Sequence, residues 1–230
     1  MVIAFANNKG GTGKSTLTTV FLEILKGQGK KVLIIDCDSQ CNLTTTFLPE
    51  DVENTLADTI LNKEIVPYTV EDYDIVPSSP TLEIIQLQMS INEVDIDVLD
   101  KAIEPHKDNY DYILIDCPPS DGNLQQVAIY ASDVCICPIN STVHAIEGAL
   151  NVKSRINDFQ KSIKFLPVRN NFDFREKFPK EVSQKCEEIF PEIAKTIIKR
   201  RVDFAEAMEY GVQGSTEINV VNDLIAEING

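Results

Sequence analysis

The chain has 230 residues, of which 43% are hydrophobic and 25% are charged, a composition that suits one globular domain with a sizeable core. The formal net charge of −15 makes nucleic-acid binding by the surface as a whole unfavourable, so any such contact requires a local basic patch. No apolar run is long enough to span a membrane and no signal-peptide pattern is present, which predicts a cytoplasmic protein.

A glycine-rich segment follows the first predicted strand, residues 2–6, and precedes apolar residues with helical spacing that begin at Leu17. This strand–turn–helix context is typical of a phosphate-binding loop, where backbone N–H groups and a helix N-terminus face the phosphates. The spacing predicts that Lys14 reaches the β- and γ-phosphates and that the Ser15 hydroxyl ligates Mg²⁺. A surface turn without a ligand is the alternative, and the flanking elements disfavour it. The residues predicted to contact nucleotide here are Lys9, Gly10, Gly11, Thr12, Gly13, Lys14, Ser15 and Thr16.

The loop departs from the common pattern because Asn8 replaces its first glycine and a second lysine, Lys9, follows. This K-G-G-x-G-K-[ST] form resembles the loop of the ParA/MinD group of P-loop ATPases. In that group the early lysine reaches across a nucleotide-sandwich dimer to the phosphates of the partner. The resemblance implies the same role for Lys9, and with it an ATP-dependent homodimer.

Residues 31–36 form a near-continuous apolar run that predicts a buried parallel strand ending at Asp36. Carboxylates at this end of a parallel strand lie where ligands bind in open α/β sheets. The segment with Asp36, Asp38 and Gln40 resembles the D-x-D-x-Q of the ParA family. The resemblance implies that Asp38 positions or activates the attacking water and that Asp36 lies near Mg²⁺. A pair of solvated loop acids is the alternative.

The middle of the chain predicts a loop and a short helix over residues 44–58, a strand over 73–78, and helices over 82–89 and 94–103. Residues 110–116 then read as a buried strand that ends in Asp116, the Walker B arrangement. Asp116 is predicted to hold Mg²⁺ through a water or an indirect contact. Pro118 and Pro119 end the strand.

The later elements are a helix over residues 124–130, strands over 133–138, 163–168 and 196–198, and helices over 181–190 and 218–228. His144 is predicted to be a surface or helix-start residue. In the resembling ATPases an asparagine after the 163–168 strand approaches the adenine, which implies Asn170 or Asn171; spacing does not decide between them. The six cysteines lack a C-x-x-C pair and are predicted to be small buried side chains rather than metal ligands. They are Cys37, Cys41, Cys117, Cys135, Cys137 and Cys186.

Residues 199–207 resemble the family segment I-P-R-N-V-R-L-A-E-A that flanks the base, which places Glu206 among the nucleotide-binding residues. Lys199 replaces the usual proline and Asp203 replaces a common basic residue, so transfer of the family's DNA contacts is in doubt. A local excess of positive charge nevertheless predicts a DNA-binding patch, with solvated charges as the alternative. Its members are Lys195, Lys199, Arg200 and Arg201, with Lys153, Arg155, Lys161 and Lys164 as a second basic group.

The sequence thus predicts a single-domain α/β P-loop NTPase over residues 1–230. Its mostly parallel, twisted sheet is expected to have about seven strands with helices on both faces, and no N-terminal helix-turn-helix is expected. The resemblance covers nearly the whole chain. It implies a Mg²⁺-dependent ATPase that is slow without its partner, uses ATP and ADP, and partitions DNA.

In this interpretation the ATP-bound dimer binds double-stranded DNA nonspecifically, so that it associates with the nucleoid. A centromere-binding, ParB-like protein stimulates hydrolysis and thereby releases it. A MinD-like membrane ATPase is disfavoured because the last predicted helix is acidic, with Glu217, Asp223 and Glu227 and no lysine or arginine. An iron–sulfur electron carrier and a nucleotide switch with negligible hydrolysis are the further alternatives.

Overall fold

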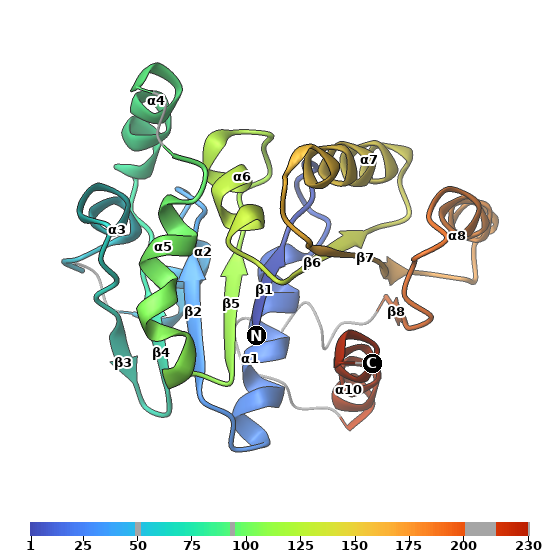
Figure 1. The fold of residues 1–230 in the computed structure, drawn as a ribbon. Coiled ribbons are helices and arrows are strands. Elements are labelled where there is room, and N and C mark those ends of the chain that lie inside the picture. The colour runs from blue at the N-terminus through green and yellow to red at the C-terminus, as the bar shows by residue number, and fades with distance from the viewer. Residues whose placement is uncertain (49–51, 93–94, 201–214, 230) are drawn as a thin grey trace.

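The computed structural model describes residues 1–48, 52–92, 95–200 and 215–229 (Figure 1). An eight-stranded sheet forms the centre of this described part, in the order β3-β4-β2-β5-β1-β6-β7-β8. Seven strands run in the same direction, and β3 alone runs antiparallel to them, paired with β4. The strands are β1 Val2–Phe5, β2 Val32–Asp36, β3 Tyr68–Val70, β4 Tyr73–Val76, β5 Tyr112–Asp116, β6 Val134–Ile139, β7 Lys164–Phe172 and β8 Ile197–Lys199.

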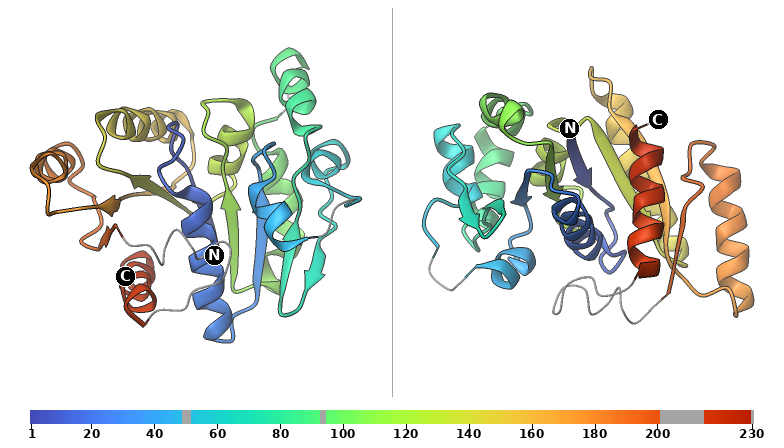
Figure 2. Two further views of the ribbon diagram at one scale, coloured as in Figure 1. Left: turned by 180° about the vertical axis from the view of Figure 1, so that it is seen from behind. Right: turned by 90° about the horizontal axis from the view of Figure 1, so that it is seen from below.

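Helices cover both faces of the sheet, as predicted, and Figure 2 shows α1 and α10 together on one face with α3 to α7 on the other. Every residue of β1 and β2 is buried, because side chains that alternate between the faces meet helices on either side. The helices are α1 Lys14–Gly27, α2 Asn42–Phe47, α3 Leu56–Asn62, α4 Leu82–Asn92, α5 Val98–Ile103, α6 Asn123–Tyr130, α7 Val143–Asp158, α8 Lys177–Ile189 and α10 Ser215–Asn229, with a 3₁₀ turn at Glu104–Asn109. None of the described helices is both long and apolar enough to cross a bilayer.

The structure corrects three expectations about the elements. The sheet gains the short edge strand β3, which the sequence pattern did not reveal. Helix α2 occupies part of the segment that was expected to be a loop. Strand β7 continues to Phe172 instead of ending at Val168, so Asn170 and Asn171 lie within the strand rather than after it.

The carboxyl ends of β1, β2 and β5 meet at one edge of the sheet. Phe5 and Asp36 are both register partners of Asp116 on β5, which lies between β1 and β2. The glycine-rich loop leaves β1 at this edge, so the register places the loop beside both aspartates.

Candidate functional site

The loop between β1 and α1 adopts a backbone that needs glycine. Gly11 and Gly13 have φ angles of 72° and 94°, in the left-handed region that L side chains rarely adopt. Gly13 also precedes the first residue of α1, and a Cβ built on it would lie 2.3 Å from Nδ2 of Asn170. The N-terminus of α1 therefore follows the loop directly, and the first N–H groups of a helix have no partner within the helix itself.

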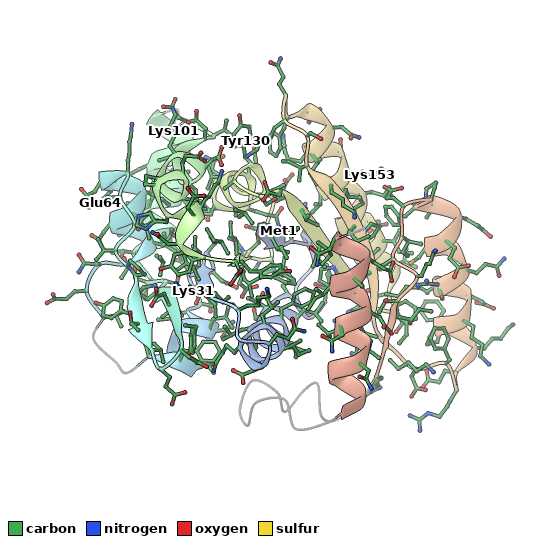
Figure 3. All side chains as sticks on the ribbon, turned by 60° about the horizontal axis from the view of Figure 1, so that its bottom comes forward. Met1, Lys31, Glu64, Lys101, Tyr130 and Lys153 are labelled. Atoms are coloured by element: carbon green, nitrogen blue, oxygen red, sulfur yellow. The ribbon has the colours of Figure 1, made fainter. Side chains whose placement is uncertain are left out.

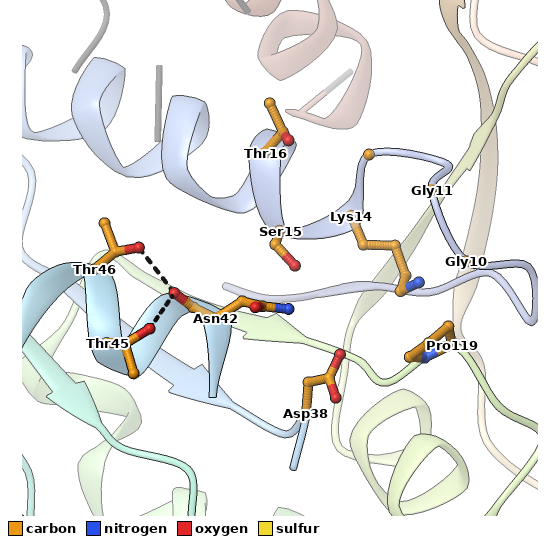
Figure 4. A pocket seen from close by; sticks show the side chains of 11 residues that line it. Gly10, Gly11, Lys14, Ser15, Thr16, Asp38, Asn42, Thr45, Thr46 and Pro119 are labelled. Atoms are coloured by element: carbon orange, nitrogen blue, oxygen red, sulfur yellow. Dashed lines mark hydrogen bonds between the residues drawn. The ribbon is translucent and has the colours of Figure 1, made fainter. Parts of the chain in front are cut away.

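A cavity of about 530 Å³ lies in front of the loop (Figure 4). Lys14 is 6% exposed, and it lines this cavity together with Ser15 and Asp38. Lys9 is exposed and is not among the residues that line it. The full lining is Gly10, Gly11, Gly13, Lys14, Ser15, Thr16, Asp38, Asn42, Thr45, Thr46 and Pro119.

Two carboxylates are buried beneath the cavity. The Ser15 hydroxyl donates a hydrogen bond to Oδ2 of Asp116 at 2.6 Å. Asp36 Oδ2 accepts hydrogen bonds from the backbone N–H and the hydroxyl of Thr44, at 3.0 and 2.8 Å. Both aspartates are fully buried. The geometry brings Ser15, Asp36 and Asp116 together, as expected for residues around one cation.

Burial raises the pKa of Asp36 to about 6, although hydrogen bonds from Thr44 and Asp38 oppose the rise. Burial and the neighbouring Asp36 raise the pKa of Asp116 well above its usual range, against the hydrogen bond from Ser15 and the charge of Lys14. Oδ1 of Asp116 is buried without a hydrogen-bond partner in the described part of the chain. A carboxylate oxygen left unpaired at this position fits a divalent cation, whose charge would favour the ionised form of both aspartates.

Among the described residues no three His, Cys, Asp or Glu side chains are arranged to hold a metal ion by themselves. A cation here would therefore depend on the Ser15 hydroxyl, on water and on phosphate oxygens, which suits Mg²⁺ because this ion keeps several waters and binds with substrate phosphates.

Asp38 is held differently from the buried pair. Its backbone carbonyl accepts a hydrogen bond from the Ser78 hydroxyl at 2.6 Å, and its Oδ1 accepts one from the backbone N–H of Gln40 at 3.1 Å. The carboxyl group itself lines the cavity, on the side away from Ser15 and α1 in Figure 4. It can therefore meet a water molecule that approaches a bound phosphate.

The remaining predicted nucleotide contacts are spread over several places. Thr12 is buried and donates to the Lys9 carbonyl. Asn170 is buried behind the loop and donates to the Thr12 carbonyl at 2.8 Å, whereas Asn171 is exposed with a φ of 61°. Glu206 lies outside the described residues.

Sequence reasoning missed one wall of the cavity. Asn42, Thr45 and Thr46 of α2 lie opposite the loop, with Pro119 from the segment after β5 (Figure 4). A signal was present, because Asn42 directly follows the D-x-D-x-Q segment and Cys41. However, three consecutive threonines disfavour a helix locally, and contacts from the fold override that preference.

The basic residues near the end of the chain divide into two groups. Lys195, Lys199 and Arg200 are exposed and form no ion pair with another described residue, while Arg201 lies outside the described residues. The second basic group is largely neutralised by partners: Lys153 pairs with Glu192, Arg155 with Asp121 and Asp158, and Lys161 with Asp100, while Lys164 donates to the carbonyls of Glu227 and Ile228.

Two smaller predictions are confirmed. His144 is exposed in the first turn of α7, where its Nδ1 lies 3.1 Å from Oε2 of Glu147. All six cysteines are free and buried. Burial raises the pKa of the Cys37, Cys117 and Cys135 thiols well above their usual range, which keeps them protonated.

Comparison with known proteins agrees with this geometry. The family described as AAA domain matches residues 1–169. The chain is 32% identical over 230 residues to the sporulation initiation inhibitor protein Soj of Bacillus subtilis, covering 91% of this chain and 88% of Soj. It is 26% identical over 226 residues to the chromosome partitioning protein ParA of Myxococcus xanthus, covering 91% of this chain and 79% of that ParA. The chain therefore belongs to the ParA/MinD family of P-loop ATPases.

Solved structures share the fold. The complex of a McdA variant from Cyanothece with ATP superposes with a TM-score of 0.83 at 22% identity, covering 98% of this chain and 95% of McdA. Cobyrinic acid a,c-diamide synthase from Mycobacterium smegmatis, with an ATP analogue and magnesium bound, superposes with a TM-score of 0.84 at 19% identity. The match covers 100% of this chain and 96% of the synthase chain. These likenesses show that the chain shares their fold.

Proposed function

We propose that this ParA-family positioning ATPase segregates DNA. ATP and Mg²⁺ bind in the cavity before the glycine-rich loop, and binding drives a face-to-face homodimer. The dimer binds double-stranded DNA without sequence preference and so associates with the nucleoid in the cytoplasm. A ParB-like, centromere-binding partner accelerates hydrolysis, which is slow without it, and the ADP-bound protein is released.

The observation that carries this proposal is the different placement of two lysines in one loop. Lys14 is buried and lines the cavity, so its ammonium group can reach a nucleotide bound in its own subunit. Lys9 belongs to the same loop but is exposed and does not line the cavity. A lysine in that position is free to contact the phosphates of a second subunit, as a sandwich dimer requires.

The geometry of the site supports the remaining roles that we propose. Backbone N–H groups from Gly10 to Thr16 face the phosphates at the start of α1. The Ser15 hydroxyl would hold Mg²⁺ together with water and phosphate oxygens, with Asp116 in indirect contact and Asp36 nearby. The ion would neutralise charge that develops on the phosphates. Asp38 accepts a hydrogen bond from the attacking water and orients it. Asn170 supports the loop from behind through the Thr12 carbonyl, which leaves exposed Asn171 as the candidate for the adenine.

The packing of α10 favours this function over a membrane-bound one. Val221, Leu224, Ile225 and Ile228 of α10 are buried in the cluster that includes α1. The apolar face that an interfacial helix would insert into lipid is therefore already occupied.

Two substitutions in the loop test the proposal. Lys14→Ala should weaken ATP binding by about 100-fold, because a charge-assisted contact to the phosphates is lost. Lys9→Ala should leave ATP binding by the monomer nearly unchanged but abolish ATP-dependent dimerisation and hydrolysis. Calorimetry with a non-hydrolysable analogue measures the first effect, and sedimentation with and without that analogue measures the second. A Lys9→Ala variant that still dimerises on addition of ATP would refute the sandwich dimer, and unchanged affinity in Lys14→Ala would refute the phosphate site.

A further inference from the structure

The side chain of Asn7 joins the glycine-rich loop to two other elements. Asn7 is fully buried, and its Nδ2 donates hydrogen bonds to the carbonyls of Pro138 on β6 at 2.9 Å and Ala145 on α7 at 3.1 Å. Its Oδ1 accepts a hydrogen bond from the backbone N–H of Lys9 at 2.9 Å. With two acceptors on one side and a donor on the other, only one orientation of the carboxamide satisfies all three partners.

This carboxamide marks the point where the backbone leaves the sheet. The last rung between β1 and β6 is the hydrogen bond from the Ala6 N–H to the Ile136 carbonyl. The next acceptor along β6 is the Pro138 carbonyl, and the Asn7 side chain occupies it in place of a backbone N–H. The main chain can therefore turn away at Asn8 without leaving that carbonyl unpaired, and the same side chain then fixes the position of the Lys9 N–H.

Gly148 of α7 packs closely against the same contact. A Cβ built on Gly148 would lie 2.2 Å from Oδ1 of Asn7 and 3.1 Å from the backbone nitrogen of Lys9. Any side chain at residue 148 would thus displace the two atoms that form the Asn7–Lys9 hydrogen bond. Figure 1 shows the segment after β1 running beside α7, in agreement with these contacts.

A second asparagine ties the loop to the start of the same helix. Asn140 donates to the Gly11 carbonyl at 3.1 Å, and its Oδ1 accepts a hydrogen bond from the Thr142 hydroxyl at 2.7 Å. Thr142 in turn caps α7 by accepting a hydrogen bond from the Ala145 N–H. Helix α7 and the segment just before it therefore hold the loop both before and after Gly10, the residue that follows Lys9.

We propose that Asn7 and Gly148 are positioning residues for Lys9, holding its backbone so that its side chain projects out of the subunit toward a partner. The inference rests on the proposed function, in which Lys9 acts across the dimer. It adds that α7 is the element against which the direction of Lys9 is set. Lys14 lies beyond Gly13, as the first residue of α1.

The first test measures the Asn7–Lys9 hydrogen bond itself and needs neither nucleotide nor dimer. Gly148→Ala should accelerate amide hydrogen exchange at Lys9 by at least about tenfold, the effect expected for one lost hydrogen bond. Asn7→Ala, which removes the acceptor without adding a clash, should do the same. Gly27→Ala is the matched control, because a Cβ on Gly27 of α1 would meet nothing within 4 Å. Unchanged exchange at Lys9 in Gly148→Ala would overturn the proposal, whatever the outcome for dimerisation.

The second test separates positioning from general damage to the loop. Gly148→Ala should weaken ATP-dependent dimerisation by at least about tenfold while monomer affinity for a non-hydrolysable ATP analogue changes less than about threefold. An equal loss of both would show that residue 148 merely supports the loop and would overturn the proposal. If the parent protein itself fails to dimerise with ATP, the sandwich dimer is refuted, and the exchange at Lys9 still decides whether Asn7 and Gly148 hold it.

Discussion

Asp38 differs from the other two carboxylates of the site because it lines the cavity, whereas Asp36 and Asp116 are fully buried beneath it. A carboxylate placed in this way can accept a hydrogen bond from a water molecule beside the terminal phosphate. Asp38→Ala should therefore lower ATP hydrolysis by about 10²- to 10⁴-fold, the usual contribution of a positioned base, while ATP still binds and the dimer accumulates. Phosphate release measures the rate, and calorimetry measures the affinity.

Asp38→Asn is the matched variant at the same residue. The amide oxygen can still accept the hydrogen bond from the Gln40 N–H, so the loop keeps its conformation, but the negative charge is lost. Hydrolysis should fall about as far as in Asp38→Ala. Turnover at the parental rate in either variant would assign the role to another residue, and Asp36 would be tested next.

Among the elements, α10 contacts the segment before β8 through the carboxylate of Glu227. Glu227 accepts hydrogen bonds from the backbone N–H groups of Lys195 and Thr196, both at 2.8 Å, and from the Thr196 hydroxyl. Burial alone would raise the pKa of Glu227, but these hydrogen bonds and the charge of Lys195 outweigh it, so the pKa lies below its ordinary value. A carboxyl whose pKa is lowered on folding stabilises the protein above its unfolded pKa, and that contribution is lost as pH falls through the folded pKa.

Glu227→Gln should therefore lower the free energy of unfolding by about 1 kcal/mol near neutral pH, and the difference from the parent should shrink below about pH 4. Urea unfolding of both proteins across this pH range measures the effect. Asp223→Asn removes the same charge from an exposed side chain of the same helix and should cost little at any pH. A loss for Glu227→Gln that does not depend on pH would show that packing, not the carboxylate, attaches α10.

The elements also show where sequence reasoning succeeds and fails. Strands β1, β2 and β5 were predictable because both faces are covered and their residues are continuously apolar, and the loop was predictable because its contacts come from consecutive residues. The edge strand β3 has three half-exposed or exposed residues and carries no such signal. Helix α2 contains three threonines, yet Asp36 fixes Thr44 and the fold places α2 against the cavity. Such features depend on contacts between distant segments, which local patterns do not encode.

At the scale of the whole molecule, the net charge of −15 is unevenly distributed. Most lysines and arginines of the described helices lie within 4 Å of a carboxylate, as Lys153 does with Glu192 and Lys101 with Asp97. Lys195, Lys199 and Arg200 at the β8 end of the sheet form no such pair with a described residue. A small basic patch on an acidic molecule can attract DNA only at short range, because salt screens charges beyond about 10 Å.

The ATP-bound dimer should therefore bind nonspecific DNA modestly, with an affinity that falls steeply with salt as phosphate contacts release counterions. Two subunits present two copies of the patch, so binding should require ATP and not ADP. Arg200→Glu should weaken binding by at least about tenfold, whereas Lys63→Glu, which makes the same charge change on the far side of the sheet after α3, should have less than about a twofold effect. A titration at two salt concentrations with ATP and with ADP measures both. DNA binding that is equally tight with ATP and ADP, or that is unchanged in Arg200→Glu, would show that the DNA site lies elsewhere. No binding at low salt with ATP would instead indicate a ParA-family ATPase that positions a protein cargo.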